Sequence, residues 1–287
     1  MPVFLKHKRN NIAHRLKQKS YVAQLILILL GVELLFLSAF TAFNLPTATG
    51  HNWQRYIIRK LHILYSQLPP GLQTRVQQQL PNSLAALTEQ DVKEAHNLRY
   101  SLYVPQAPVA IFIGYVLGWP LAVITAVLYL LLAFLGPLIK IYPLTSSNGM
   151  DYYLQPGFGY LAGMVIAAGW VGYISQGKRT STKQLLSLLA GLLCIHGIGL
   201  IYMLGISLFS TVYNAGGAQL YWSAWLFEEA RNLSWYALPY DFLFSLLLIG
   251  IGFPLRWLVN ILMSPDIASQ NGSAQSENLV NLHPAIR

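Results

Sequence analysis

The sequence predicts an all-α membrane protein with about six transmembrane helices, and its composition and hydropathy pattern support this prediction. Of the 287 residues, 54% are hydrophobic and only 10% are charged, whereas a soluble domain carries about a quarter charged residues. The apolar residues gather in long runs, and a helix needs about 20 of them to cross a bilayer. The stretch from Leu102 to Ile174, interrupted mainly by glycine, proline and neutral polar residues, holds about three crossings.

Apolar segments and their breaks place the predicted helices. Six segments are expected to cross the membrane: 21–43, 102–117, 120–139, 158–176, 184–209 and 236–262. Gly118-Trp119-Pro120 separates the second from the third, and a glycine- and proline-containing stretch precedes the fourth. Pro254 is expected to break the sixth helix.

Basic residues predict the orientation of the chain. The net charge of +9 is concentrated before the first segment, at Lys6, Lys8, Arg9, Arg15, Lys17 and Lys19. Such a cluster is retained in the cytoplasm, and it also favours contact with the headgroups of the lipid bilayer. We therefore expect a multi-pass protein of the plasma membrane with both termini cytoplasmic, and we see no pattern typical of nucleic-acid binding.

Five regions follow from this reading. Residues 1–20 form a basic cytoplasmic N-terminus, 21–43 the first helix, 44–101 an extracytoplasmic insertion, 102–263 the other five helices, and 264–287 a flexible polar tail. The insertion begins with an amphipathic pattern in which Trp53, Ile57 and Leu61 recur at helical spacing among basic residues. That pattern predicts a helix on the membrane surface.

Four residues are candidates for binding a small ligand. Asp241 begins the sixth apolar run, where an ionisable group is costly and points to a functional site or to a structural hydrogen bond. Gln106 follows Pro105 at the outer end of the second segment, where its amide can donate and accept. Asn148 lies in the loop before the fourth segment, and Tyr160 lies on that segment, where core packing is an alternative role.

Other polar residues within the apolar segments are less informative. Glu33 in the first helix is compatible with a polar pocket, a partner subunit or a local hydrogen bond, and His196 in the fifth is expected to be structural. The sequence has no Walker loop, no histidine pair at ligand spacing and no cysteine cluster, so no catalytic residue, metal or cofactor is predicted. If ATP energises transport, the nucleotide binds another polypeptide.

Three motifs in order resemble the BioY family, the biotin-specific substrate-binding components of energy-coupling factor (ECF) transporters. Gly118-Trp-Pro-Leu-Ala-Val-Ile-Thr-Ala-Val-Leu-Tyr-Leu-Leu-Leu is similar to the family's Gly-Pro-Arg-Leu-Gly…Tyr-Leu-Leu-Leu segment. Pro156-Gly-Phe-Gly-Tyr-Leu-Ala-Gly is similar to Pro-Thr-Gly-Gly-Tyr-Leu-Leu-Gly, and Leu238-Pro-Tyr-Asp241 to Leu-Pro-Gly-Asp. The resemblance covers roughly residues 102–262, with the first helix matching by position only.

This resemblance implies a six-helix ECF S component that captures biotin from outside with high affinity. Its partners would be a transmembrane coupling subunit and two ATPase subunits. The family's first helix presents small residues to the coupling subunit, which here suggests Ser38, Ala39 and Ala42, with intramolecular packing as the alternative. Hydrogen bonds to the neutral ureido ring would come from Asp241, Gln106 and Asn148, and Tyr160 would supply an apolar wall.

The chain departs from the family pattern in three places. Phe244 replaces a lysine three residues after the family's aspartate, Val104 replaces a threonine, and the 44–101 connection is much longer. Because that lysine is absent, Lys140 and Arg231 are the candidates to pair with a ligand carboxylate.

Three alternatives remain at this stage. The chain could be an S component for another small vitamin, or a membrane scaffold that binds a protein through its long loop. It could also be an intramembrane hydrolase that uses Asp151 and Asp241.

Overall fold

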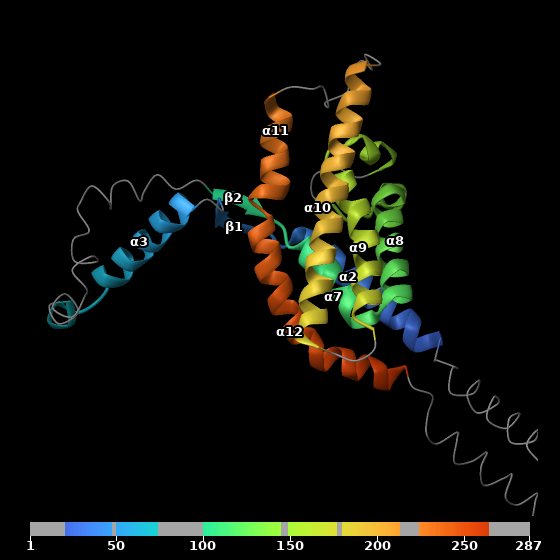
Figure 1. Ribbon diagram of the computed structural model, residues 1–287, viewed down its shortest axis with the longest axis horizontal. Coiled ribbons are helices and arrows are strands. Elements are labelled where there is room, and N and C mark those ends of the chain that lie inside the picture. Colours follow the sequence, from blue (N-terminus) through green and yellow to red (C-terminus); the bar gives the residue numbers. More distant parts are fainter. Residues whose placement is uncertain are drawn as a thin grey trace, which may run out of the picture.

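The computed structural model describes residues 21–47, 50–73, 100–144, 149–176, 180–212 and 224–263. Most of them are helical (Figure 1). The α-helices are α2 (Tyr21–Phe40), α3 (Gly50–Ser66), α7 (Gln106–Leu117), α8 (Trp119–Leu135), α9 (Phe158–Ile174), α10 (Ser181–Val212), α11 (Ala224–Ala230) and α12 (Leu238–Leu262). Two short 3₁₀ helices, η1 (Gly136–Ile139) and η2 (Met150–Leu154), a π-helical turn, η3 (Arg231–Trp235), and two strands, β1 (Phe43–Pro46) and β2 (Tyr100–Tyr103), complete the described elements.

Helices occupy all six predicted apolar segments, which confirms the all-α membrane fold. Four stretches are long and apolar enough to cross a bilayer: Tyr21–Phe40, Trp119–Ile139, Ser181–Phe209 and Leu226–Ile261. The helices α7 and α9 are equally apolar but shorter. The count of six crossings therefore stays a prediction, as do the predicted regions 1–20 and 264–287, which lie outside the described residues.

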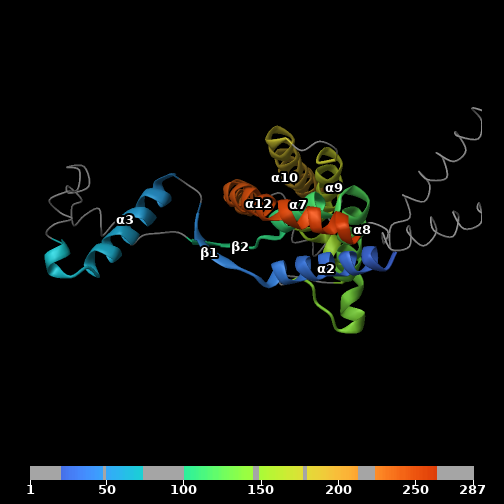
Figure 2. The same ribbon diagram turned by 90° about the horizontal axis from the view of Figure 1, so that it is seen from below.

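Helix α7 lies at the centre of the bundle. Ten of its twelve residues are buried, and it packs against α2, α8, α9, α10 and α12. Figure 2 shows α9 and α10 on one side of α7 and α2 on the other. A helix that is apolar all round is suited to this position, because each of its faces meets another helix.

Glycines set the tight packing around α7, α8 and α9. Gly118 joins α7 to α8 in a left-handed conformation (φ 79°), and Pro120 begins α8 directly after it. This confirms the turn predicted at Gly118-Trp119-Pro120. Helix α9 approaches the same turn at Gly172, where a Cβ atom would come within 2.3 Å of the Trp119 backbone nitrogen.

The first apolar segment ends in a strand and the second begins in one, so the helix bounds predicted at 43 and 102 are wrong. β1 and β2 pair antiparallel, with Phe43 opposite Tyr103 and Pro46 opposite Tyr100. The chain therefore leaves the bundle along one strand and returns to it along the other. Strand pairing gives the backbone groups of residues 43–46 and 100–103 the partners that a helix would otherwise supply.

The insertion begins with the predicted helix, α3, which extends away from the bundle (Figures 1 and 2). Its first turn is held by a hydrogen bond from Asn52 to Thr47, the residue after β1. Trp53 also contacts α12, with its ring centroid 6.1 Å from that of Tyr240. Ile57 and Leu64 on its apolar face are exposed. Contact of this face with lipid stays a prediction.

The structure corrects two expectations for the other helices. Ser38 and Ala39 are buried inside the bundle, so these two small residues pack within the chain and are not available to a coupling subunit. Glu33 on the same helix is exposed and does not face the interior.

Pro254 lies inside a continuous α12 and does not end it. The helix bends in its last third (Figure 1), as expected where a proline removes a backbone donor.

The packing at Gly172 gives a first prediction. We expect Gly172→Ala to destabilise the protein by about 1–3 kcal/mol, because the added methyl group would overlap backbone that cannot move without shifting α8. The measurement is the thermal melting temperature in detergent. Gly250→Ala is the control, since a Cβ atom there meets nothing within 4 Å. Equal melting temperatures for the two variants would contradict the close approach of α9 to the α7–α8 turn.

Candidate functional site

Several elements meet at one end of the bundle and enclose a cavity of about 250 Å³. This volume is just below the usual range for ligand sites and therefore suits a small molecule. Proline and glycine end the loops that lead into it: Pro105 precedes α7, Gly157 precedes α9, and Pro239 lies in the first turn of α12. The lining residues with polar side chains are Tyr103, Gln106, Tyr152, Tyr160, His196, Asn232 and Asp241.

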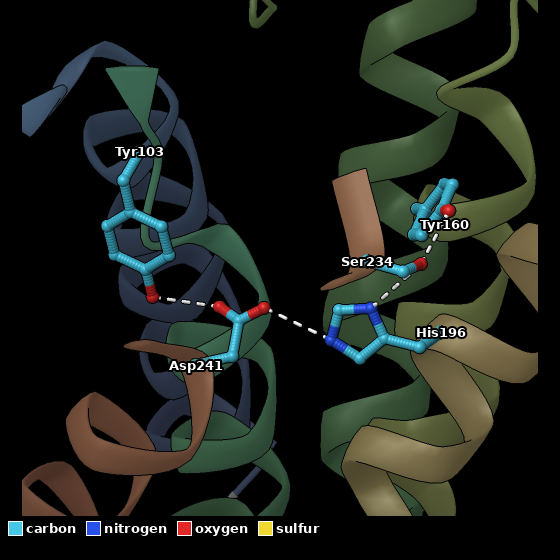
Figure 3. Close-up of polar contacts among 5 residues, drawn as sticks. All are labelled: Tyr103, Tyr160, His196, Ser234 and Asp241. Atoms are coloured by element: carbon cyan, nitrogen blue, oxygen red, sulfur yellow. Dashed lines mark hydrogen bonds and ion pairs between the residues drawn. The ribbon is translucent and has the colours of Figure 1, made fainter. Parts of the chain in front are cut away.

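Asp241 is the most constrained polar residue of the cavity. It is only 3% exposed and lies in the first turn of α12, where the helix dipole stabilises a negative charge. The hydroxyl of Tyr103 donates a hydrogen bond of 2.8 Å to Oδ1, and Nε2 of His196 lies 3.1 Å from Oδ2 (Figure 3). The carboxylate thus joins β2, α10 and α12.

His196 continues this polar chain toward α9. Its Nδ1 lies 3.3 Å from Oγ of Ser234, and that hydroxyl shares a 2.7 Å hydrogen bond with the hydroxyl of Tyr160 (Figure 3). The Nε2 contact with Asp241 is at ion-pair distance without the alignment of a hydrogen bond. The resulting order is Tyr103–Asp241–His196–Ser234–Tyr160, and all five side chains are buried.

Aspartate, histidine and serine in contact are the residue types of a hydrolase triad, but the geometry here does not suit a nucleophile. Ser234 is absent from the cavity lining and lies behind Tyr160 and His196. Its oxygen already bonds to the Tyr160 phenol, so a ligand in the cavity would not reach it. The alternative hydrolase that pairs Asp151 with Asp241 is also wrong, because Asp151 is exposed on η2 and does not line the cavity.

Gln106 is held at the other side of the cavity. Its amide nitrogen donates a 2.8 Å hydrogen bond to the hydroxyl of Tyr129, which donates in turn to the Pro143 carbonyl at 3.0 Å. Because Tyr129 is 1% exposed, the amide is oriented by a rigid partner. The amide oxygen then remains on the side chain as an acceptor.

Aromatic rings support the polar groups. Phe244 stacks on Tyr103 with a centroid separation of 5.4 Å and on Phe43 at 5.9 Å. The position at which the family has a lysine therefore positions the Tyr103 hydroxyl in this chain. Burial raises the pKa of Tyr152 to about 12, and burial followed by the charge of Asp241 raises the pKa of Tyr103, so both phenols are hydrogen-bond donors at neutral pH.

The structure brings together three of the four predicted site residues. Gln106, Tyr160 and Asp241 all line the cavity, whereas Asn148 lies outside the described residues. The two guesses for a carboxylate partner do not reach it. Lys140 is exposed after η1, and Arg231 lies 3.5 Å from Glu228 and stacks over Tyr236 at 5.5 Å.

Sequence reasoning missed several residues of the site. His196 was expected to be structural, and its pairing with Asp241 across two helices leaves no local signal in the sequence. The sequence analysis also did not identify Tyr103 and Ser234 as site residues, because Tyr103 lies in an apolar segment and Ser234 in a predicted loop. A buried aspartate implies partners elsewhere in the membrane, and the fifth segment's only histidine was the available signal.

Comparisons with known proteins found one family and one solved structure similar to this chain. The model of the BioY family matches residues 103–258. A solved structure of the S-component for biotin from an ECF-type ABC transporter is similar to this chain, with 21% identity, a TM-score of 0.39, and coverage of 55% of this chain and 75% of that one. No curated protein matches.

The bond from Tyr103 to Asp241 gives a second prediction. We expect Tyr103→Phe to cost about 1–3 kcal/mol of stability, because a buried carboxylate oxygen loses its donor while the aromatic stacking is kept. Thermal melting in detergent measures the loss. Tyr100→Phe makes the same chemical change on the same strand, where the ring is 47% exposed, and should leave the melting temperature unchanged. A loss no larger than that of the control would show that the bond does not support the site.

Proposed function

Because this chain belongs to the BioY family, we propose that it binds biotin from outside the cell for high-affinity uptake. Members of the family are substrate-binding components of transporters and not enzymes, so the chain is a membrane transport component. The observation that carries the proposal is the convergence of Gln106, Tyr160 and Asp241 on one small cavity.

The polar groups of the cavity complement a ureido ring. Such a ring has two N–H donors and one carbonyl acceptor. Asp241 keeps free lone pairs on both oxygens after bonding to its two partners, and therefore accepts from ring nitrogens. The amide of Gln106 and the phenol of Tyr152, which also line the cavity, supply further acceptor and donor capacity.

The apolar lining complements the rest of the ligand. Ala107, Leu144, Leu161, Met164 and Ile195 form a wall around the polar groups. This wall suits a thiophane ring and an aliphatic chain, because burying apolar surface contributes about 25 cal/mol per Å². Biotin combines a neutral polar ring with such surface and so matches both parts of the lining.

Transport requires partners. We propose that a transmembrane coupling subunit and two ATPase subunits act with this chain, and that both of its termini are cytoplasmic. The cluster of basic residues before α2 and the apolar helices support a plasma-membrane location with this orientation. With Ser38 and Ala39 buried, the exposed face of α2 that includes Leu30 and Leu37 is the surface left for the coupling subunit.

Phe244 favours a second candidate, an S component for another small vitamin. The aromatic side chain replaces the family's lysine beside Asp241 and removes a positive charge from the site. A site without this positive charge would favour a ligand that has no carboxylate. Competition between vitamins separates the two candidates.

The binding proposal is tested by calorimetric titration of the detergent-solubilised protein with biotin, with riboflavin and thiamine as controls. We expect tight binding of one biotin per chain and no heat from the other two vitamins. Tight binding of riboflavin or thiamine, with none of biotin, would establish the second candidate in its place.

A variant tests the role of Asp241. We expect Asp241→Ala to weaken biotin binding by about 1–3 kcal/mol, because a ligand N–H would lose its acceptor. Asp151→Ala removes an exposed carboxylate outside the cavity and should bind as the natural protein does. Unchanged affinity in a correctly folded Asp241→Ala protein would remove Asp241 from the binding site.

A further inference from the structure

The cavity has an unusual balance of charge for a site that receives an anion. Its described lining contains one carboxylate, on Asp241, one imidazole, on His196, and three phenols, but no lysine or arginine. A ligand carboxylate entering this space would bring a second negative charge next to a buried first one. Two such charges repel strongly where water does not screen them.

Nearby segments do not supply an evident cation. Arg231 is engaged with Glu228 and Tyr236, and Lys140 is exposed away from the cavity. Among the residues that the structure describes, the groups left to compensate for a ligand carboxylate are those that line the cavity.

The pair of Asp241 and His196 can compensate for the charge of a ligand carboxylate. Both side chains are buried, and Nε2 lies 3.1 Å from Oδ2. Two ionisable groups this close take up and release protons as one unit. The groups that face the pair are the phenol of Tyr103 on β2, the phenol of Tyr160 on α9 through Ser234, and Glu229 on α11, which interacts electrostatically with Tyr160.

We infer that a ligand carboxylate enters this cavity together with one proton, which the Asp241–His196 pair holds. The inference rests on the proposed function, since biotin supplies the carboxylate. The ligand carboxylate adds one negative charge to the site, and the proton that the pair takes up cancels it. The pair thereby compensates for the charge of an anionic ligand in a chain where Phe244 replaces the family's lysine.

Proton uptake is measured directly by titrating the protein with biotin in two buffers of different ionisation enthalpy at the same pH. We expect the difference in heat to correspond to about one proton taken up per biotin bound. By linkage, the dissociation constant should then rise about tenfold per pH unit over the pH range in which one proton is taken up. Biotinamide, which lacks the carboxylate charge, is the matched ligand and should bind without proton uptake and with a constant dissociation constant.

A variant of His196 tests whether the Asp241–His196 pair takes up the proton that accompanies biotin. His196→Gln keeps a side chain that can donate to Asp241 but does not titrate. We expect it to abolish the proton uptake and to flatten the dependence of biotin affinity on pH. Its folding is checked by thermal melting beside Tyr100→Phe, and the two-buffer titration of the natural protein tests the inference even if this variant fails to fold.

The possible results separate the inference from the proposed function. Tight biotin binding with no proton uptake and a pH-independent affinity would overturn the inference and leave the proposed function standing. Equal proton uptake with biotinamide would also overturn it, because the proton would not then accompany the carboxylate. If a folded protein binds no biotin at any pH tested, the proposed function fails and the inference fails with it.

Discussion

The carboxylate of Asp241 is the group around which this end of the bundle is organised. A buried charge is tolerated only when neighbouring groups satisfy it, and here those neighbours come from β2 and α10. Each of them is held by another contact, Tyr103 by the stacked ring of Phe244 and His196 by Ser234. Satisfying one carboxylate therefore fixes the relative positions of three segments that are far apart in the sequence.

The sequence predicted the helices well because the bilayer imposes a strong and simple constraint. Apolar length alone located α8 and α10, and Gly118 with Pro120 marked the turn between α7 and α8. The ends of the segments were predicted less well. Residues 43 and 102 belong to apolar runs, and only the pairing of two distant strands shows that they are not helical.

The candidate site was predictable in part for the same reason. Asp241 and Gln106 are polar residues beside apolar runs, and this contrast is visible in one sequence. Tyr103 and His196 acquire their roles only from contact with Asp241. Such pairing depends on how helices pack, which hydropathy does not encode. Lys140 and Arg231 were suggested from their charge, but neither lines the cavity, because charge alone does not tell whether a side chain reaches it.

The ribbon of β1 and β2 determines how the insertion is attached to the bundle. Phe43 and Tyr103 are neighbours across the ribbon, so the two ends of the insertion are anchored side by side. The entropic cost of closing such a loop grows only slowly with its length. A longer or shorter segment between the two strands would therefore close at this point for little additional entropy, and the ribbon separates the length of the insertion from the packing of the helices.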